Sequence, residues 1–267
     1  MAGRGTGPDF VEALARGIDV LCCFEAHRGS MSLSEVAAET GLARPTARRL
    51  LLTLAELGYV RATADGFELT ARVLRLGMSY VGSLGLWDVA RPHLEALVAQ
   101  THESSSMAQL DGSDIVYVAR VAVPKIIALR VDIGTRFPAS VTSQGKVLLA
   151  GLDDDGVRAA LAEPTRSGLV VAAPAVEEVL DELRVVRARG WAVADEELAR
   201  GVRSIAVPVR DATGTVRAAM NVTVHAAETS LETLTGHHLP LLLRAAGEVS
   251  ADWALWQSRP HADAPVT

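Results

Sequence analysis

The chain has 267 residues and a mass of 28.2 kDa, a length that suggests about two domains. Hydrophobic residues make up 49% and charged residues 22%, a balance that excludes intrinsically disordered and fibrous proteins. The sequence has no run of the ~20 apolar residues that a membrane-spanning helix needs, and residues 1–8 lack the apolar core of a signal peptide. We therefore expect a cytoplasmic protein without membrane contact.

The net charge of −6 is unevenly distributed along the chain. Residues 1–85 carry nine Arg and nine Asp or Glu, whereas residues 86–267 carry the whole excess of acid. Four arginines fall within eighteen residues: Arg44, Arg48, Arg49 and Arg61. A local cluster of cations neutralises phosphates whatever the total charge, so this segment is a candidate for contact with nucleic acid.

The first two predicted helices occupy residues 9–27 and 33–40. In the first, apolar residues recur every three or four positions, which predicts one helical face turned toward a core. Those positions are Phe10, Leu14, Ile18 and Leu21. In the second, Ser32 and Glu35 have the spacing of a capping box, and Gly41 ends the helix.

A third helix is predicted to begin near Pro45, since proline is tolerated in the first helical turn. Its expected core positions are Ala47, Leu50, Leu51, Leu54 and Leu57. Leu52 lies off that face, which leaves open whether it packs on a neighbouring helix or contacts DNA. Residues 59–70 then alternate around Asp65-Gly66, the signal of a β-hairpin.

This order of elements predicts a winged helix-turn-helix, in which the second helix of the pair enters the major groove by its N-terminal end. Arginine side chains read guanine and bind phosphate, and a helix N-terminus attracts phosphate. The candidate DNA-binding residues are Arg44, Pro45, Thr46, Arg48 and Arg49, with Arg61 on the hairpin. The alternative is a generic helical bundle with a solvated arginine-rich face.

The rest of the chain predicts an α+β domain with an antiparallel sheet, because the apolar period changes from helical to alternating after Ser104. Expected strands are residues 105–110, 115–121, 126–131, 191–196, 203–209 and 216–225. Expected helices are residues 86–102, 143–151, 154–161, 175–189 and 230–256.

Five segments carry a resemblance to the IclR family of bacterial regulators, and most closely to its branch that controls protocatechuate and 4-hydroxybenzoate catabolism. They are residues 10–21 (FVEALARGIDVL), 33–42 (LSEVAAETGL), 46–60 (TARRLLLTLAELGYV), 134–150 (GTRFPASVTSQGKVLLA) and 195–209 (DEELARGVRSIAVPV). The likeness extends from about residue 9 to about residue 256. One departure is Ala43, where the family commonly has a Ser or Thr cap before the recognition helix.

The resemblance implies a domain plan: a winged helix-turn-helix domain at residues 1–70, a linker helix at 71–86, a GAF-like effector-binding domain at 87–256, and a flexible tail at 257–267. It also implies an effector pocket. Its expected wall is Ile126, Leu129, Phe137, Ser143, Gln144, Asp195, Val202, Ser204, Asn221 and Thr223.

The expected partners follow from the same resemblance. They are double-stranded operator DNA, a second copy of the chain in a homodimer or a dimer of dimers, and a small organic acid, with an aromatic or cyclic carboxylic acid as the first choice. Gln144 stands where the aromatic-acid branch commonly has Met. Arg203 is a candidate carboxylate clamp if it points inward; otherwise it is solvated or salt-bridged.

Two other functions compete with this interpretation. Ser143 and Lys146 fit S-x-x-K, the nucleophile motif of penicillin-binding enzymes, but the chain lacks the companion K-T-G. An enzyme using the C-terminal pocket, with the winged domain serving dimerisation, therefore remains the alternative function, beside a ligand-binding module without a role on DNA. We expect no cofactor and no metal, because the histidines lack ligand spacing; Thr142 and Ser143 are also suited simply to cap a helix.

Overall fold

The computed structural model describes residues 7–26, 29–76, 86–124, 131–169, 171–172 and 174–258. The chain divides into two compact units, Met1–Ser83 and Leu84–Thr267. The fold is α+β, as the change of period predicts. Within the described segments, no helix is long and apolar enough to cross a bilayer.

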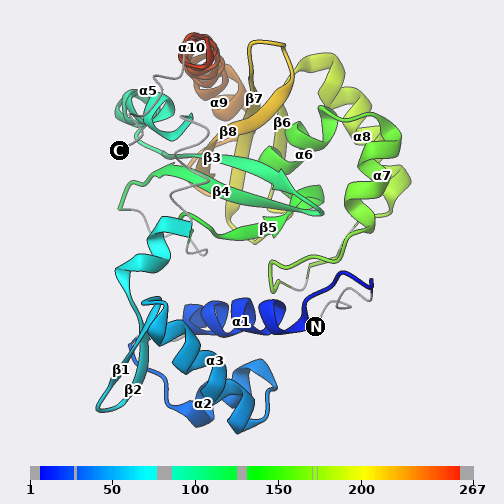
Figure 1. The fold of residues 1–267 in the computed structure, drawn as a ribbon. Coiled ribbons are helices and arrows are strands. Elements are labelled where there is room, and N and C mark those ends of the chain that lie inside the picture. Colours follow the sequence, from blue (N-terminus) through cyan, green and yellow to red (C-terminus); the bar gives the residue numbers. More distant parts are fainter. Residues whose placement is uncertain are drawn as a thin grey trace. The chain divides into compact units, whose positions relative to one another are not determined.

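The first unit contains three helices followed by a two-stranded hairpin (Figure 1). Its elements are α1 (Glu12–Cys22), α2 (Leu33–Thr40), α3 (Arg44–Glu56), β1 (Val60–Thr63) and β2 (Gly66–Leu69), with 3-10 turns at Cys23–Ala26 and Ala71–Val73. The helix-turn-helix and its wing therefore form as predicted. The expected linker at residues 71–86 lies mostly outside the described residues.

Local capping chemistry fixes both ends of α2. The backbone N–H of Glu35 donates to Ser32 Oγ (3.3 Å), and the N–H of Ser32 donates to Glu35 Oε2 (2.7 Å), which confirms the capping box. Gly41 follows with φ of 66°, a left-handed conformation that glycine adopts without strain. The chain is then free to turn into α3.

The apolar face of α1 differs from the prediction. Within the chain, Phe10, Leu14 and Ile18 are exposed, and Val20 is the residue of α1 that the core of the unit buries. In α3, Ala47, Leu51 and Leu54 are buried as predicted, whereas Leu57 is exposed. Periodicity identifies an apolar face correctly but does not say which surface covers it.

The second unit is built on an antiparallel sheet in the order β5-β4-β3-β8-β7-β6. Its strands are β3 (Ser104–Asp111), β4 (Asp114–Val121), β5 (Arg136–Pro138), β6 (Ala192–Asp195), β7 (Val202–Arg210) and β8 (Val216–His225). Strand β5 was not predicted, and the expected strand at 126–131 falls almost entirely on residues outside the described ones.

The helices of this unit cover both faces of the sheet (Figure 1). They are α5 (Leu86–Thr101), α6 (Ser143–Ala150), α7 (Asp154–Ala162), α8 (Val176–Arg189), α9 (Leu231–Thr233) and α10 (Leu239–Gln257). One core lies between the sheet and α5 with α10, and the other lies between the sheet and α6 to α8. The single helix expected at 230–256 is interrupted by a π-helical turn, Leu234–His238.

Candidate functional site

The outer face of α3 carries arginines that are available to an external partner. Arg44, Arg48 and Arg49 are exposed, and their side chains form no hydrogen bond or ion pair with the described residues. Pro45 is exposed and Thr46 is half-buried beside them. The N-terminus of α3 has no side-chain cap at Ala43. Its Pro45 has no N–H, and the N–H of Thr46 donates to the carbonyl oxygen of Ala43 at 2.9 Å. An anion meets guanidinium groups and a helix N-terminus together at this surface.

Two neighbouring positions refine this surface. Leu52 is 44% exposed, so it is not buried against a neighbouring helix, and contact with DNA stays open for it. Arg61 on β1 lies opposite Glu68 on β2, and its Nε donates to a carboxylate oxygen of that residue. Unlike the arginines of α3, Arg61 therefore already has a counter-ion.

The second unit encloses a cavity between the sheet and α6, with about 520 Å³ of empty space when its open mouth is counted. Strand register places polar side chains on its floor in two adjacent rows. One row consists of Arg120, Ser106 and Asn221 on β4, β3 and β8; the next consists of Thr223, Ser204 and Ala194 on β8, β7 and β6. Alternation along each strand sends the intervening residues to the opposite core.

Arg120 is the cation on this floor. It is half-buried, and its Nη1 donates to Ser106 Oγ at 3.0 Å. Burial lowers the pKa of Arg120, because its guanidinium loses hydration. Among the described residues, no carboxylate lies within ion-pair distance of it. A desolvated cation at a cavity wall is stabilised by an anionic ligand.

The N-terminus of α6 forms the roof of the cavity. Thr142 caps the helix, since its Oγ1 accepts a hydrogen bond from the N–H of Gly145 at 3.1 Å, as predicted. Ser143 Oγ lies 2.7 Å from Ser204 Oγ, which ties the roof to the floor. A Cβ at Gly145 would lie 2.1 Å from the carbonyl oxygen of Ala139, so glycine is required for the preceding turn to pack against α6.

Tyr117 and Phe137 form an aromatic wall, with ring centroids 5.7 Å apart in an edge-to-face arrangement. Burial raises the pKa of Tyr117 to about 12, so its hydroxyl stays neutral at physiological pH.

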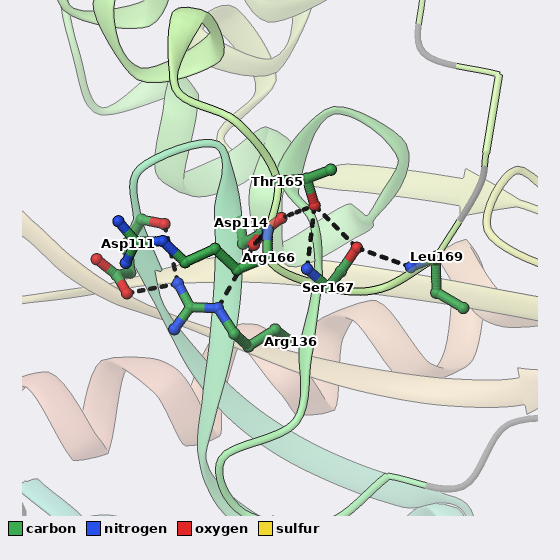
Figure 2. Close-up of polar contacts among 7 residues, drawn as sticks. All are labelled: Asp111, Asp114, Arg136, Thr165, Arg166, Ser167 and Leu169. Carbon is green, nitrogen blue, oxygen red and sulfur yellow. Dashed lines mark hydrogen bonds and ion pairs between the residues drawn. The ribbon is translucent and has the colours of Figure 1, made fainter. Parts of the chain in front are cut away.

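The neighbouring edge of the sheet is held by the buried carboxylate of Asp114 (Figure 2). That carboxylate accepts hydrogen bonds from Thr165 Oγ1 (2.6 Å) and the N–H of Arg166 (2.7 Å), and it pairs with Arg136.

Sequence reasoning and the cavity agree in large part. Seven of the ten expected wall residues line it: Phe137, Ser143, Gln144, Val202, Ser204, Asn221 and Thr223. Ile126 and Leu129 lie outside the described residues. Asp195 is not at the wall, because its neighbour Ala194 takes the inward position; Asp195 Oδ1 instead accepts from Arg203 Nε at 2.6 Å. Arg203 is therefore salt-bridged and is not a clamp in the cavity.

The wall residues that sequence reasoning missed are Tyr117, Arg120, Val131, Val141, Thr142, Ala194 and Leu198. In a regular strand over residues 115–121, Tyr117 and Arg120 would point to opposite faces of the sheet, because one position is odd and the other even. A β-bulge on β4 changes this alternation: Met107 pairs with Ala119 and Ala108 with Tyr117, so Val118 is an extra residue, and both Tyr117 and Arg120 reach the cavity. That irregularity has no signal in the sequence.

Ser143 and Lys146 do not form the pair that an acyl-transfer enzyme needs. Lys146 is buried, and its Nζ lies 2.7 Å from carboxylate oxygens of both Glu182 and Glu197, while Ser143 is bonded to Ser204. Within the described residues, no group of three or more potential ligands has the arrangement of a metal site.

A winged helix-turn-helix joined in one chain to a unit that encloses a cavity is the architecture of a transcriptional regulator. A family model described as the IclR helix-turn-helix domain matches residues 13–64, and the bacterial transcriptional regulator IclR C-terminal model matches residues 78–251. The chain therefore belongs to the IclR family of bacterial transcriptional regulators.

Individual relatives support this assignment. The Pca regulon regulatory protein of Pseudomonas putida is 39% identical over 248 residues, covering 91% of this chain and 84% of its own length. The p-hydroxybenzoate hydroxylase transcriptional activator of Acinetobacter baylyi is 37% identical over 250 residues, covering 90% and 91%. The crystal structure of a putative transcriptional regulator from Rhodococcus is 48% identical, with a TM-score of 0.79, covering 92% of this chain and 100% of the other.

Proposed function

We propose that this protein is a regulator of aromatic catabolism that binds operator DNA and responds to an aromatic carboxylic acid. The observation that carries the ligand class is Arg120, a half-buried guanidinium at the cavity wall without a carboxylate partner among the described residues. We infer that an aromatic ring packs beside Tyr117 and Phe137, and that a carboxylate pairs with Arg120. The names of the relatives in Pseudomonas and Acinetobacter support the same class.

The DNA-binding role rests on the exposed face of α3. Arg44, Arg48 and Arg49 contact the major groove or its flanking phosphates, and Pro45 and Thr46 lie at the same end of the helix. A protein with this role acts in the cytoplasm and does not need catalysis, in keeping with relatives that are named as regulators. The effector changes operator affinity by a coupling free energy of ~1–3 kcal/mol, typical of such linkage.

The working unit is a homodimer, and a dimer of dimers is the larger assembly to test. Two recognition helices then reach half-sites about one DNA turn apart, ~34 Å. The exposed apolar positions Leu14 and Ile18 of α1, with Phe10 just before the helix, supply a surface that self-association would cover. Such a face on an isolated chain is unfavourable in water.

The test combines two measurements on the purified full-length protein. A footprint on the DNA upstream of its own gene measures operator binding, and a thermal-shift screen against benzoate and its hydroxylated derivatives measures ligand binding. We expect protection of a site containing two half-sites, and stabilisation by at least one aromatic acid that also changes the footprint titration. Turnover of an aromatic acid without any footprint would replace this function with an enzymatic one.

A further inference from the structure

Gln144 presents an unsatisfied acceptor at the effector cavity. Its side chain is 1% exposed, it lines the cavity, and its Oε1 has no hydrogen-bond partner among the described residues. Buried polar atoms in folded proteins almost always have a partner, and a missing one costs ~1–3 kcal/mol. Gln144 therefore calls for an explanation that the packing of the chain itself does not give.

The amide orientation of Gln144 is determined by its other end. Its Nε2 donates one hydrogen to the carbonyl oxygen of Ala219 (2.9 Å) and the other to that of Ser106 (3.2 Å). Turning the amide over would place Oε1 against both carbonyl oxygens, which cannot donate. The two backbone carbonyls of β3 and β8 therefore hold Oε1 in its unpartnered position.

Ser106 connects this acceptor to the cation on the cavity floor. Its carbonyl oxygen accepts from Gln144, and its hydroxyl accepts from Arg120 Nη1 at 3.0 Å. Gln144 and Arg120 therefore contact the same residue, Ser106, and both line the same cavity. A ligand anchored at Arg120 by its carboxylate brings its ring substituents toward Gln144.

We propose that Gln144 is a specificity-determining residue that selects ligands carrying a hydrogen-bond donor on the ring. A phenolic hydroxyl or an aromatic amine donates to Oε1, whereas a bare ring leaves Oε1 unpaired. This inference rests on the proposed function, and it adds a requirement for a donor to the requirement for a carboxylate. A site built to pair with a hydroxyl rejects an analogue that lacks it more strongly than an apolar pocket does.

The first experiment uses the full-length wild-type protein and three matched pairs of ligands. Each hydroxybenzoate isomer is compared with the corresponding fluorobenzoate by calorimetric titration, since fluorine is similar in size but cannot donate. The aminobenzoate of the same isomer tests a second donor. For at least one isomer we expect the hydroxy and amino acids to bind about ten-fold or more tightly than the fluoro acid.

The second experiment replaces the acceptor. Gln144→Met has similar length and volume without the amide, and Gln109→Met is the matched control, because it makes the same change on β3 outside the cavity lining. We expect the hydroxy-over-fluoro preference to fall to about two-fold or less in Gln144→Met and to persist in Gln109→Met. Circular dichroism and the binding of the fluoro acid itself establish that the variant cavity is intact.

The outcomes separate the two proposals. Binding of benzoates with equal affinity for every hydroxy and fluoro pair overturns the role of Gln144 and leaves the carboxylate site standing. A preference that persists in Gln144→Met overturns it as well. If no benzoate binds the wild-type protein at all, the proposed aromatic-acid function fails, and the donor requirement fails with it.

Discussion

The two units of the chain use arginine in opposite ways. On α3, Arg44, Arg48 and Arg49 are exposed and keep their hydration until a partner arrives. In the second unit, Arg120 is half-buried at a cavity wall, where burial lowers its pKa. An exposed group of arginines suits an extended polyanion, whereas one partly desolvated guanidinium suits a single carboxylate.

Arg136 represents a third environment, in which the chain supplies the counter-ions. It pairs with Asp111 and with the buried Asp114, so it holds the edge of the sheet instead of a ligand (Figure 2). The exposure of an arginine and its ion pairs within the chain, considered together, therefore distinguish a residue that binds a partner from one that stabilises the fold.

Replacing Arg120 with Met should weaken binding of the carboxylate effector by about a hundred-fold or more, because a partly desolvated charge pair loses one partner. Calorimetric titration with a hydroxybenzoate measures the loss. Operator affinity without effector should stay within about two-fold of the wild type. Arg217→Ala is the control, since Arg217 is exposed and paired with Asp211; equal losses in both variants would contradict the assignment of Arg120.

Asp114→Asn should lower the free energy of unfolding by about 2–3 kcal/mol, because an amide cannot accept from every donor that faces this buried carboxylate. Urea titration followed by tryptophan fluorescence is suitable, since all four tryptophans lie in residues 86–267. Asp111→Asn removes the exposed partner of the same arginine and should cost well under 1 kcal/mol. Equal costs would show that Asp114 is not an anchor of the sheet edge.

Arg48→Ala should weaken operator binding by ~1–3 kcal/mol if its guanidinium contacts a base, and should relax sequence preference at that position. Gel-shift titration against the operator and a scrambled sequence separates this from a phosphate contact, which weakens both sequences alike. Binding of the effector should be unchanged. Unaltered affinity in both Arg48→Ala and Arg49→Ala would remove α3 from the groove.

Local signals in the sequence were sufficient for the DNA-binding half of the molecule. The capping box at Ser32, the turn at Gly41 and the Asp65-Gly66 hairpin depend on neighbours in the chain, so each is visible as a short pattern. A local pattern was not sufficient for α1, where Leu14 was predicted to face a core but is exposed. An apolar stripe on a helix does not show which surface it packs against.

The cavity required knowledge that short patterns do not contain. Arg120 and Arg203 both lie on predicted alternating strands, and the sequence offered Arg203 as the candidate clamp. Which arginine faces the cavity depends on how β4 and β7 are placed in the sheet, and on Asp195 standing directly opposite Arg203. The pairing register of distant strands therefore determines which arginine faces the cavity. The family motifs were sufficient to predict seven of the cavity-lining residues.

The smallest expected effect concerns the wing, where Arg61 combines exposure with an internal partner. Glu68 already neutralises it, so Arg61→Ala should change operator affinity by less than about 1 kcal/mol, as surface pairs contribute little.

Glu68→Gln should act in the opposite direction, because it releases the guanidinium and removes a negative charge near the phosphates. We expect operator affinity to rise a few-fold, and the slope of log K against log salt to steepen by about one. Gel shifts at several salt concentrations measure both, with the double variant lacking Arg61 as the control. An unchanged slope in Glu68→Gln would mean that the wing does not reach the DNA backbone through Arg61.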